Sequence, residues 1–422
     1  MSPCMPFRLS SLDRLLSHWA ILSFARWAAA TIIATIAAAS TITAAAQPPA
    51  ATPPAAQPTD SSPALTLDPQ LPYQAERRSP VTYDVDFSVV VTPPYQTKRL
   101  QVWIPSPPSD AGQEVSGSEW SSFPTFVEPR LGVEPKFGNR FAYFEFVNPQ
   151  GALILRHRFR IQVWELRWNI EPSKVATVER WPSAFDAYRM SESQGVVVDE
   201  RVRRLLGEVV GKPSNPLHGM TSIMHWADSN LTYDHVDASL AASSIHALEK
   251  RRGHCSDYHG LCASLGRALG YPTRITYGIN PFPKNSPSHC KLEAYLPPYG
   301  WVSFDVSETQ KLAALVGKQE GLSEDERRRL REAAYARLAG GFRDNTWYLQ
   351  TRGSDFDLAP PASRRAAVVR TAYVEADGIP LADPDPANKK QTAHAWMTVH
   401  SYRPNRVVAY PFTDLQSLDI AR

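Results

Sequence analysis

Apolar positions follow two different periods along the chain. Between residues 81 and 91, apolar residues alternate with mostly polar ones, which is typical of a strand with one buried face. The same alternation occurs at residues 100–104 and 159–163, and proline-rich turns separate such runs. Residues 81–175 are therefore predicted to form a small N-terminal β domain that is β-sandwich-like.

The apolar period becomes helical after about residue 180. One helix is predicted behind Asp199, whose side chain can cap a helix start, because the apolar residues that follow fall on one face. A second helix is predicted to begin at Asn215-Pro216, with the capping residue before the proline. A short third helix is predicted behind Ser244 and before Gly253.

The last part of the chain, residues 363–422, is predicted to be a C-terminal β extension. Residues 368–374 alternate in polarity, and Asp377-Gly378 is a hairpin signal. Residues 395–399 could pair with that hairpin. Such strands can extend either the β domain or the domain that precedes them.

The first 46 residues have the features of an export signal. Arg8, Arg14 and Arg26 precede an uncharged run that closes in three alanines before Gln47. The alternative is a retained N-terminal anchor, since about 20 apolar residues can span a bilayer. Residues 47–80 are rich in Pro, Ala, Thr and Ser and are predicted to be a flexible linker. The remainder is expected to be exported to the periplasm, the cell surface or the medium.

Charge and composition limit the partners. The 45 basic and 42 acidic residues are spread along the chain and leave a net charge of +3. Because this gives no concentrated positive field, neither nucleic acid nor, after signal cleavage, a membrane surface is expected as a partner.

Cysteine usage points to a free thiol. Without Cys4, which would leave with the signal, the mature chain keeps Cys255, Cys262 and Cys290. This odd number in an oxidising compartment implies at least one free thiol. Cys262 and Cys290 could pair, or each could be a small buried apolar residue.

Cys255 lies at the predicted start of a buried helix. Gly253 permits a sharp turn into that helix, and Gly270 followed by Pro272 ends it. The unpaired N–H groups and the positive dipole end of the first turn favour the thiolate, which is the nucleophilic form of cysteine. The backbone N–H of Cys255 is the expected donor to an oxyanion. Trp226 and Tyr233 upstream are expected to be core aromatic residues.

A predicted hairpin supplies a base and a carboxylate. Its two strands, joined by a Pro/Gly turn, begin at His289 and end at Asp305. Antiparallel pairing brings these two ends side by side, so that His289 can contact Cys255 on one side and Asp305 on the other.

These motifs resemble the transglutaminase-like superfamily. The resemblance covers roughly residues 220–310, from Gly-x-Cys at a helix start to Gly300-Trp301 and Asp305, and a further stretch at residues 344–360 looks like the closing strand. It implies an α+β, papain-like transglutaminase core at residues 176–362, with helices packed on an antiparallel sheet. It also implies that Cys255, His289 and Asp305 are the catalytic triad.

The chain departs from the family pattern at Lys291, where the family commonly has tryptophan two positions after the histidine. We expect this difference to affect the shape of the substrate cleft more than the chemistry. The paired residues His254-Cys255 and His289-Cys290 could alternatively bind zinc, but neighbouring side chains point in different directions. His254 and His259 are otherwise expected to make local hydrogen bonds or to be exposed.

The resemblance implies thiol acyl chemistry on a protein or peptide substrate, with no cofactor and no metal. Water would resolve the thioester in a peptidase or amidase, and a lysine amine would do so in a transglutaminase. We expect hydrolysis of peptide-like amides. The alternative is a catalytically inactive transglutaminase-fold binding or scaffold module, since fold alone does not prove activity.

Overall fold

Two long antiparallel strands, β1 (Glu76–Val91) and β6 (Leu153–Arg167), form the centre of the first sheet. The computed structural model in which they are seen describes residues 65–211, 215–282, 287–382 and 394–418. Further strands of this sheet are β3 (Gln113–Phe123), β12 (Phe342–Arg343) and β16 (Ala395–Pro404). The predicted signal, residues 1–46, lies outside the described residues.

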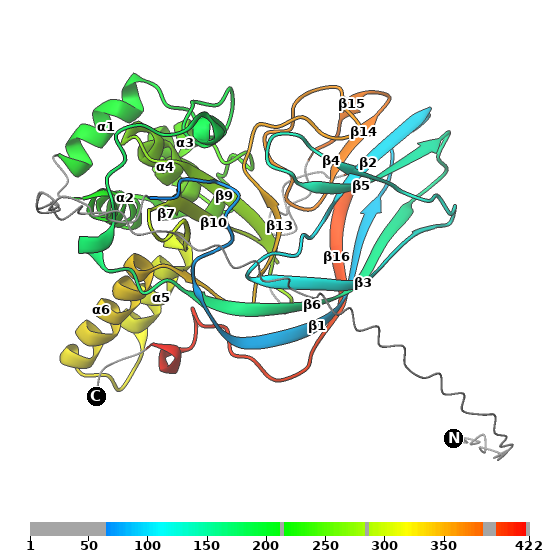
Figure 1. Ribbon diagram of the computed structural model, residues 1–422. Coiled ribbons are helices and arrows are strands. Elements are labelled where there is room, and N and C mark those ends of the chain that lie inside the picture. The colour runs from blue at the N-terminus through cyan, green and yellow to red at the C-terminus, as the bar shows by residue number, and fades with distance from the viewer. Residues whose placement is uncertain (1–64, 212–214, 283–286, 383–393, 419–422) are drawn as a thin grey trace, which may run out of the picture. The chain divides into compact units, whose positions relative to one another are not determined.

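A second sheet completes a β-sandwich (Figure 1). Its strands are β2 (Arg99–Ser106), β4 (Arg130–Val133), β5 (Arg140–Val147), β14 (Tyr373–Ala376) and β15 (Ile379–Pro380). Alternate residues of both sheets, such as Val85, Phe87 and Val102, are buried in one apolar cluster. This confirms the strands expected from the period-two pattern.

The C-terminal strands join the sandwich. Asp377 and Gly378 both have positive φ and turn β14 into β15, as the hairpin signal indicates. The predicted pairing of residues 395–399 with this hairpin is wrong, because β16 pairs with β1 and β14 pairs with β2. Periodicity identifies a strand but does not specify its partner.

The helical region is built around a third, antiparallel sheet. Its strand order is β11 (Trp301–Phe304), β10 (Ser288–Tyr295), β9 (Thr273–Ile279) and β13 (Tyr348–Arg352). The helices lie beside this sheet, on the side away from the sandwich (Figure 1). They are α1 (Glu200–Val210), α2 (Pro216–Asn230), α3 (Ser244–Lys250), α4 (Cys255–Ala268), α5 (Val306–Lys318) and α6 (Glu324–Gly340).

Helix starts follow the predicted caps with one shift. The Asp199 carboxylate accepts a hydrogen bond from a backbone N–H of α1, and the Asn215 amide oxygen does the same for α2. The third helix is capped by Ser243 rather than Ser244. The Ser244 hydroxyl instead donates to the Gly195 carbonyl oxygen at 2.9 Å, so a tertiary contact decides between two adjacent serines.

The segment before β1 is packed against the helical region, although residues 47–80 are predicted to be a flexible linker. The Tyr73 hydroxyl donates to the Glu293 carboxylate at 2.6 Å, and Trp301 Nε1 donates to the Pro69 carbonyl oxygen at 2.9 Å. Strand β1 also begins inside that range, at Glu76. The composition of this segment is an average over many residues, so it does not reveal that a single aromatic residue, Tyr73, holds the segment against the helical region.

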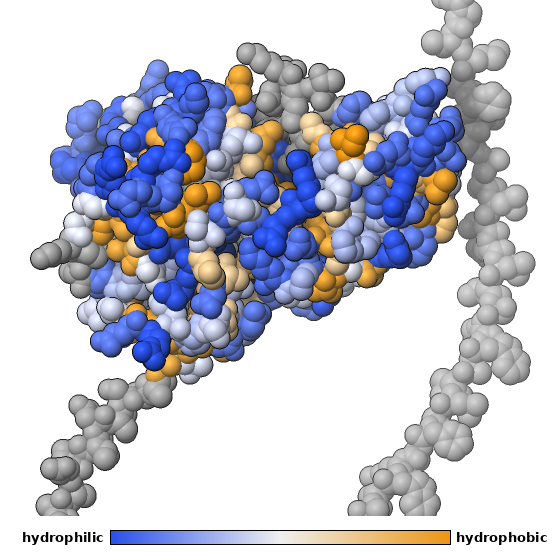
Figure 2. Space-filling model, turned by 90° about the horizontal axis from the view of Figure 1, so that it is seen from above, coloured by the Kyte–Doolittle hydropathy of each residue, from blue (hydrophilic) through white to orange (hydrophobic). Residues whose placement is uncertain are grey.

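Polar residues cover most of the face seen in Figure 2, where apolar residues form small, separate patches. The parts of the chain that the structure describes include no helix with the length and apolar character that crossing a bilayer requires.

Candidate active site

The first turn of α4 positions Cys255. The N-cap residue His254 accepts the Ser256 N–H at Nδ1 over 3.1 Å, and the Asp257 carboxylate accepts the His254 N–H at 3.2 Å. Gly253 has φ of 153°, and a Cβ there would lie 2.6 Å from the Cβ of Asp257, so only glycine fits. Cys255 is therefore held at the positive end of a buried helix, as the sequence predicts.

The β10–β11 hairpin brings the base and the carboxylate together. The register pairs Leu292 with Phe304, so the next residues along each strand direction are Lys291 and Asp305. His289 Nε2 donates to Asp305 Oδ2 at 2.7 Å. Asp305 also caps α5 by accepting a backbone N–H, which fixes its orientation.

The imidazole can contact the thiol through its other nitrogen. Because Asp305 occupies Nε2 of His289, Nδ1 is left to face Cys255. The side chains of Cys255 and His289 form a hydrogen bond. Cys255, His289 and Asp305 are 7%, 2% and 2% exposed, so the structure brings the three predicted site residues together in a nearly dry environment.

Electrostatics favour a thiolate and an imidazolium. A hydrogen bond from the Cys290 thiol, opposed by burial and reinforced by the charge of His289, holds the pKa of Cys255 well below its ordinary value. Burial alone would lower the pKa of His289, but the charges of Asp305 and Cys255 outweigh it and raise this pKa to about 9. Both shifts favour the thiolate–imidazolium ion pair at neutral pH.

Lys291 lies behind this ion pair and not in the cleft. Its ammonium donates to Asp305 Oδ2 at 2.7 Å and to Asp344 Oδ2 at 2.9 Å, and the whole residue is buried. The expectation that this residue shapes the substrate cleft is therefore wrong. A buried ammonium requires carboxylate partners, and Lys291 is not among the residues that line the pocket of Cys255.

The expectation that His259 makes local hydrogen bonds or is exposed is wrong, because this ring is buried and bonds to residues far along the chain. Its Nε2 accepts the Val306 N–H at 3.2 Å, and its Nδ1 lies 3.4 Å from the Cys290 sulfur. Burial lowers the pKa of His259 to about 4, so this ring is neutral. The described cysteines, Cys255, Cys262 and Cys290, are all free thiols.

A narrow pocket exposes the thiol. It leaves about 10 Å³ for the centre of a water molecule, which is room for roughly one water. Its lining includes Cys255, His254, His289, Tyr277 and Arg370. The sequence analysis missed Tyr277 and Arg370, since a buried tyrosine in a strand and an arginine in a loop carry no local signal of a site.

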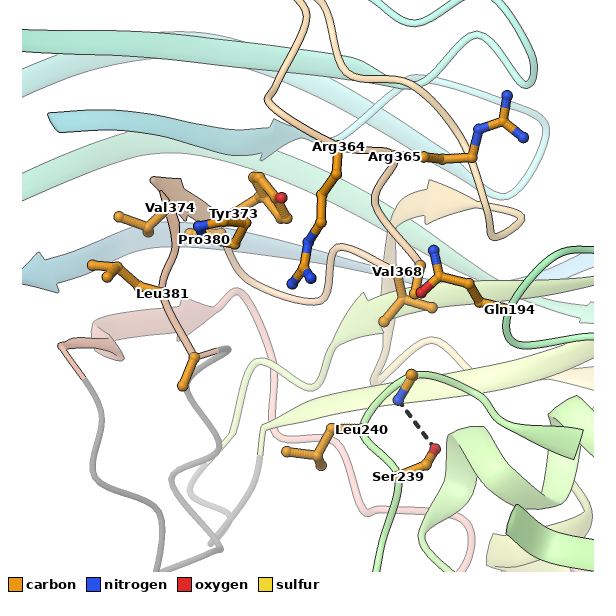
Figure 3. Close-up of a pocket in the computed structure, with 14 residues that line it drawn as sticks. Gln194, Ser239, Leu240, Arg364, Arg365, Val368, Tyr373, Val374, Pro380 and Leu381 are labelled. Carbon is orange, nitrogen blue, oxygen red and sulfur yellow. Dashed lines mark hydrogen bonds between the residues drawn. The ribbon is translucent and has the colours of Figure 1, made fainter. Parts of the chain in front are cut away.

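A larger cavity of about 350 Å³ lies beside the start of α4. In Figure 3, the side chain of Arg364 points into it, between Tyr373 and Val368, with Leu240 on the opposite wall. Ser239 from this lining also donates to the Asp257 carboxylate, two residues after the thiol. The cavity and the thiol pocket are thus linked through the first turn of α4.

Metal binding finds no support in the described ranges, where no group of three or more His, Cys, Asp or Glu residues is placed to hold an ion.

Comparisons with known proteins agree with this architecture. Residues 203–306 match the model of the Transglutaminase-like superfamily, so this segment is similar to transglutaminase-like domains. It is 25% identical over 342 residues to an uncharacterized protein of Haemophilus influenzae, a match that covers 73% of this chain and 88% of that protein.

Solved structures confirm the fold class. A "Putative Cysteine Protease" from Cytophaga hutchinsonii superimposes with a TM-score of 0.55 at 15% identity, over 82% of this chain and 98% of that one. The periplasmic domain of TgpA from Pseudomonas aeruginosa matches with a TM-score of 0.29 at 16% identity, over 55% and 71% of the two chains. The likeness to the Cytophaga hutchinsonii structure confirms the α+β, papain-like fold.

Proposed function

We propose that this chain is an exported thiol enzyme that cleaves peptide-like amides through a thioester, with Cys255 as nucleophile, His289 as acid and base, and Asp305 as the orienting carboxylate. The observation that carries the proposal is the 2.7 Å bond between His289 and Asp305 beside a buried thiolate at a helix start. This is the arrangement of nucleophile, base and orienter that acyl transfer needs.

In the first step the Cys255 sulfur attacks the amide carbonyl carbon and an S–C bond forms. The C–N bond then breaks, and the proton of the His289 imidazolium passes to the leaving amine. In the second step His289 takes a proton from water, whose oxygen attacks the thioester and releases the acid and the thiolate. Asp305 keeps the ring in one orientation throughout.

The substrate is proposed to be a protein or peptide. The cavity beside the start of α4 supports this, because about 350 Å³ can hold one or two side chains of an extended segment. Arg364, which points into that cavity (Figure 3), favours an acidic side chain there.

The test compares the mature protein with two matched variants on peptide substrates and on a glutamine donor with an amine acceptor. Cys255→Ala should abolish release of the amine, whereas Cys262→Ala should retain it. Cys262 is a fully buried thiol of the same helix, and burial raises its pKa to about 12.

The acceptor decides the reaction type. Release of free acid supports hydrolysis, and covalent incorporation of the amine would replace hydrolysis by cross-linking. Equal turnover in the wild type and Cys255→Ala would overturn Cys255 as the nucleophile. No turnover together with slow iodoacetamide labelling of Cys255 would leave the inactive scaffold as the function.

A further inference from the structure

Two buried polar groups line the thiol pocket with no partner at hydrogen-bond distance. They are Tyr277 Oη and His254 Nε2, both residues border the pocket that contains Cys255, and the His254 ring also interacts with the Cys255 side chain. An unpaired buried polar group costs about 1–3 kcal/mol. Two such groups in one small pocket indicate a polar ligand that is bound only during function.

Each group can act as a donor. His254 Nδ1 accepts the Ser256 N–H at 3.1 Å, so a ring proton lies on Nε2. Burial raises the pKa of Tyr277 well above its ordinary value, so its hydroxyl stays protonated. Tyr277 pairs with Cys290 across β9 and β10, one position from His289.

The sequence analysis suggested the backbone N–H of Cys255 as the oxyanion donor, but this group already has a partner. The backbone N–H of Cys255 faces the Tyr233 hydroxyl, so additional donors would be needed to stabilise negative charge on oxygen. Arg370 adds a positive charge to the pocket, close enough to act on both Tyr277 and His254. The pocket has space for roughly one oxygen-sized group.

We propose that Tyr277 Oη and His254 Nε2 donate to the oxyanion that forms when the Cys255 thiolate attacks the substrate carbonyl, with the charge of Arg370 supporting it. This inference rests on the proposed function. When the S–C bond forms, the carbonyl π electron pair moves onto oxygen, and the two donors bind that oxygen until the pair returns and the leaving group departs.

Two reagents separate this role from a general effect on the thiol. 4-Nitrophenyl acetate acylates cysteine through a tetrahedral oxyanion and releases nitrophenolate in a burst. Iodoacetamide alkylates the same sulfur by direct displacement of iodide, without an oxyanion. Both rates are measured on the full mature chain under single-turnover conditions.

The variants remove one donor each. Tyr277→Phe deletes the hydroxyl alone, and His254→Asn keeps a good helix cap while deleting Nε2. Tyr348→Phe is the matched control, because Tyr348 also has a buried hydroxyl without a partner but lies outside the lining of the pocket.

We expect acylation by 4-nitrophenyl acetate to fall roughly 10²-fold in Tyr277→Phe and in His254→Asn. Alkylation by iodoacetamide should be unchanged in Tyr277→Phe and should fall less than acylation in His254→Asn, because His254 also helps to lower the pKa of Cys255. Tyr348→Phe should match the wild type in both assays. Wild-type acylation rates in Tyr277→Phe and His254→Asn would overturn the inference while leaving the proposed function intact. A wild type with no burst dependent on Cys255 would overturn both.

A second ester tests whether the two donors instead bind a carboxylate of the substrate. 4-Nitrophenyl hydrogen succinate carries a free carboxylate, and 4-nitrophenyl acetate does not. A loss confined to the succinate ester would overturn the oxyanion role and assign the two donors to a substrate carboxylate. A similar loss with both esters supports the oxyanion role.

Discussion

Replacing Lys291 with methionine would remove the positive charge that lies between two buried carboxylates. The ammonium donates to Asp305 at 2.7 Å and to Asp344 at 2.9 Å, and all three side chains are at most 1% exposed. Methionine fills a similar volume, so little cavity is created, and the loss is mainly electrostatic.

Each hydrogen bond to a charged group contributes about 1.5–3 kcal/mol, and breaking a buried ion pair by removing one partner costs about 3–5 kcal/mol. We therefore expect the free energy of unfolding of Lys291→Met to fall by about 3–5 kcal/mol near pH 7.5. Urea unfolding followed by tryptophan fluorescence measures it.

The pH dependence gives the sharper test. In the wild type, burial is outweighed by the charges of His289 and Lys291, which hold the pKa of Asp305 low. Lys291 does the same for Asp344. These low pKa values stabilise the fold above the ordinary carboxylate range and lose their effect as the pH falls. In Lys291→Met both pKa values rise, so folding takes up protons and the deficit should be smaller near pH 5 than near pH 7.5.

Two further variants complete the test. Asp344→Asn in the Lys291→Met background should recover part of the loss, because it removes one uncompensated charge. Lys174→Met, which breaks the exposed pair with Glu171, should leave stability unchanged. A loss below about 1 kcal/mol, as for a surface pair, or one independent of pH, would refute this reasoning.

Three other outcomes are expected. Between about pH 6.5 and 9 the folded pair holds its proton on His289 and the unfolded chain holds it on Cys255, so both states bind one proton and pH-dependent urea unfolding should show no net change from this pair; a decline of about 3 kcal/mol over that range would mean that Cys255 rests as the thiol. Gly278→Ala should lower the melting temperature in calorimetry, since its Cβ would lie 2.1 Å from the Tyr348 carbonyl oxygen and such overpacking costs about 1–3 kcal/mol; an unchanged melting temperature would contradict it. Tyr73→Phe should cost about 1–3 kcal/mol in urea unfolding, because it removes the 2.6 Å bond to buried Glu293; an equal midpoint would mean that this segment adds no stability.

The sequence by itself determined the local features of this protein. Alternating apolar residues identified β1, β2 and β6, and capping residues identified the helix starts, because each pattern repeats over a few residues. The site residues followed for the same reason. Cys255 is next to a helix start, and His289 and Asp305 are the two ends of one hairpin, so short-range geometry already brings them close.

Only the tertiary structure decided which partner each buried polar group has for its hydrogen bond or ion pair. Lys291 contacts Asp344, 53 residues away, and Tyr73 contacts Glu293, 220 residues away. The pairing of β16 with β1 is of the same kind. Many partners are compatible with one local pattern, and the choice depends on which arrangement leaves the fewest buried charges and backbone groups unpaired. That balance is set by the whole fold, so no single segment of the sequence contains it.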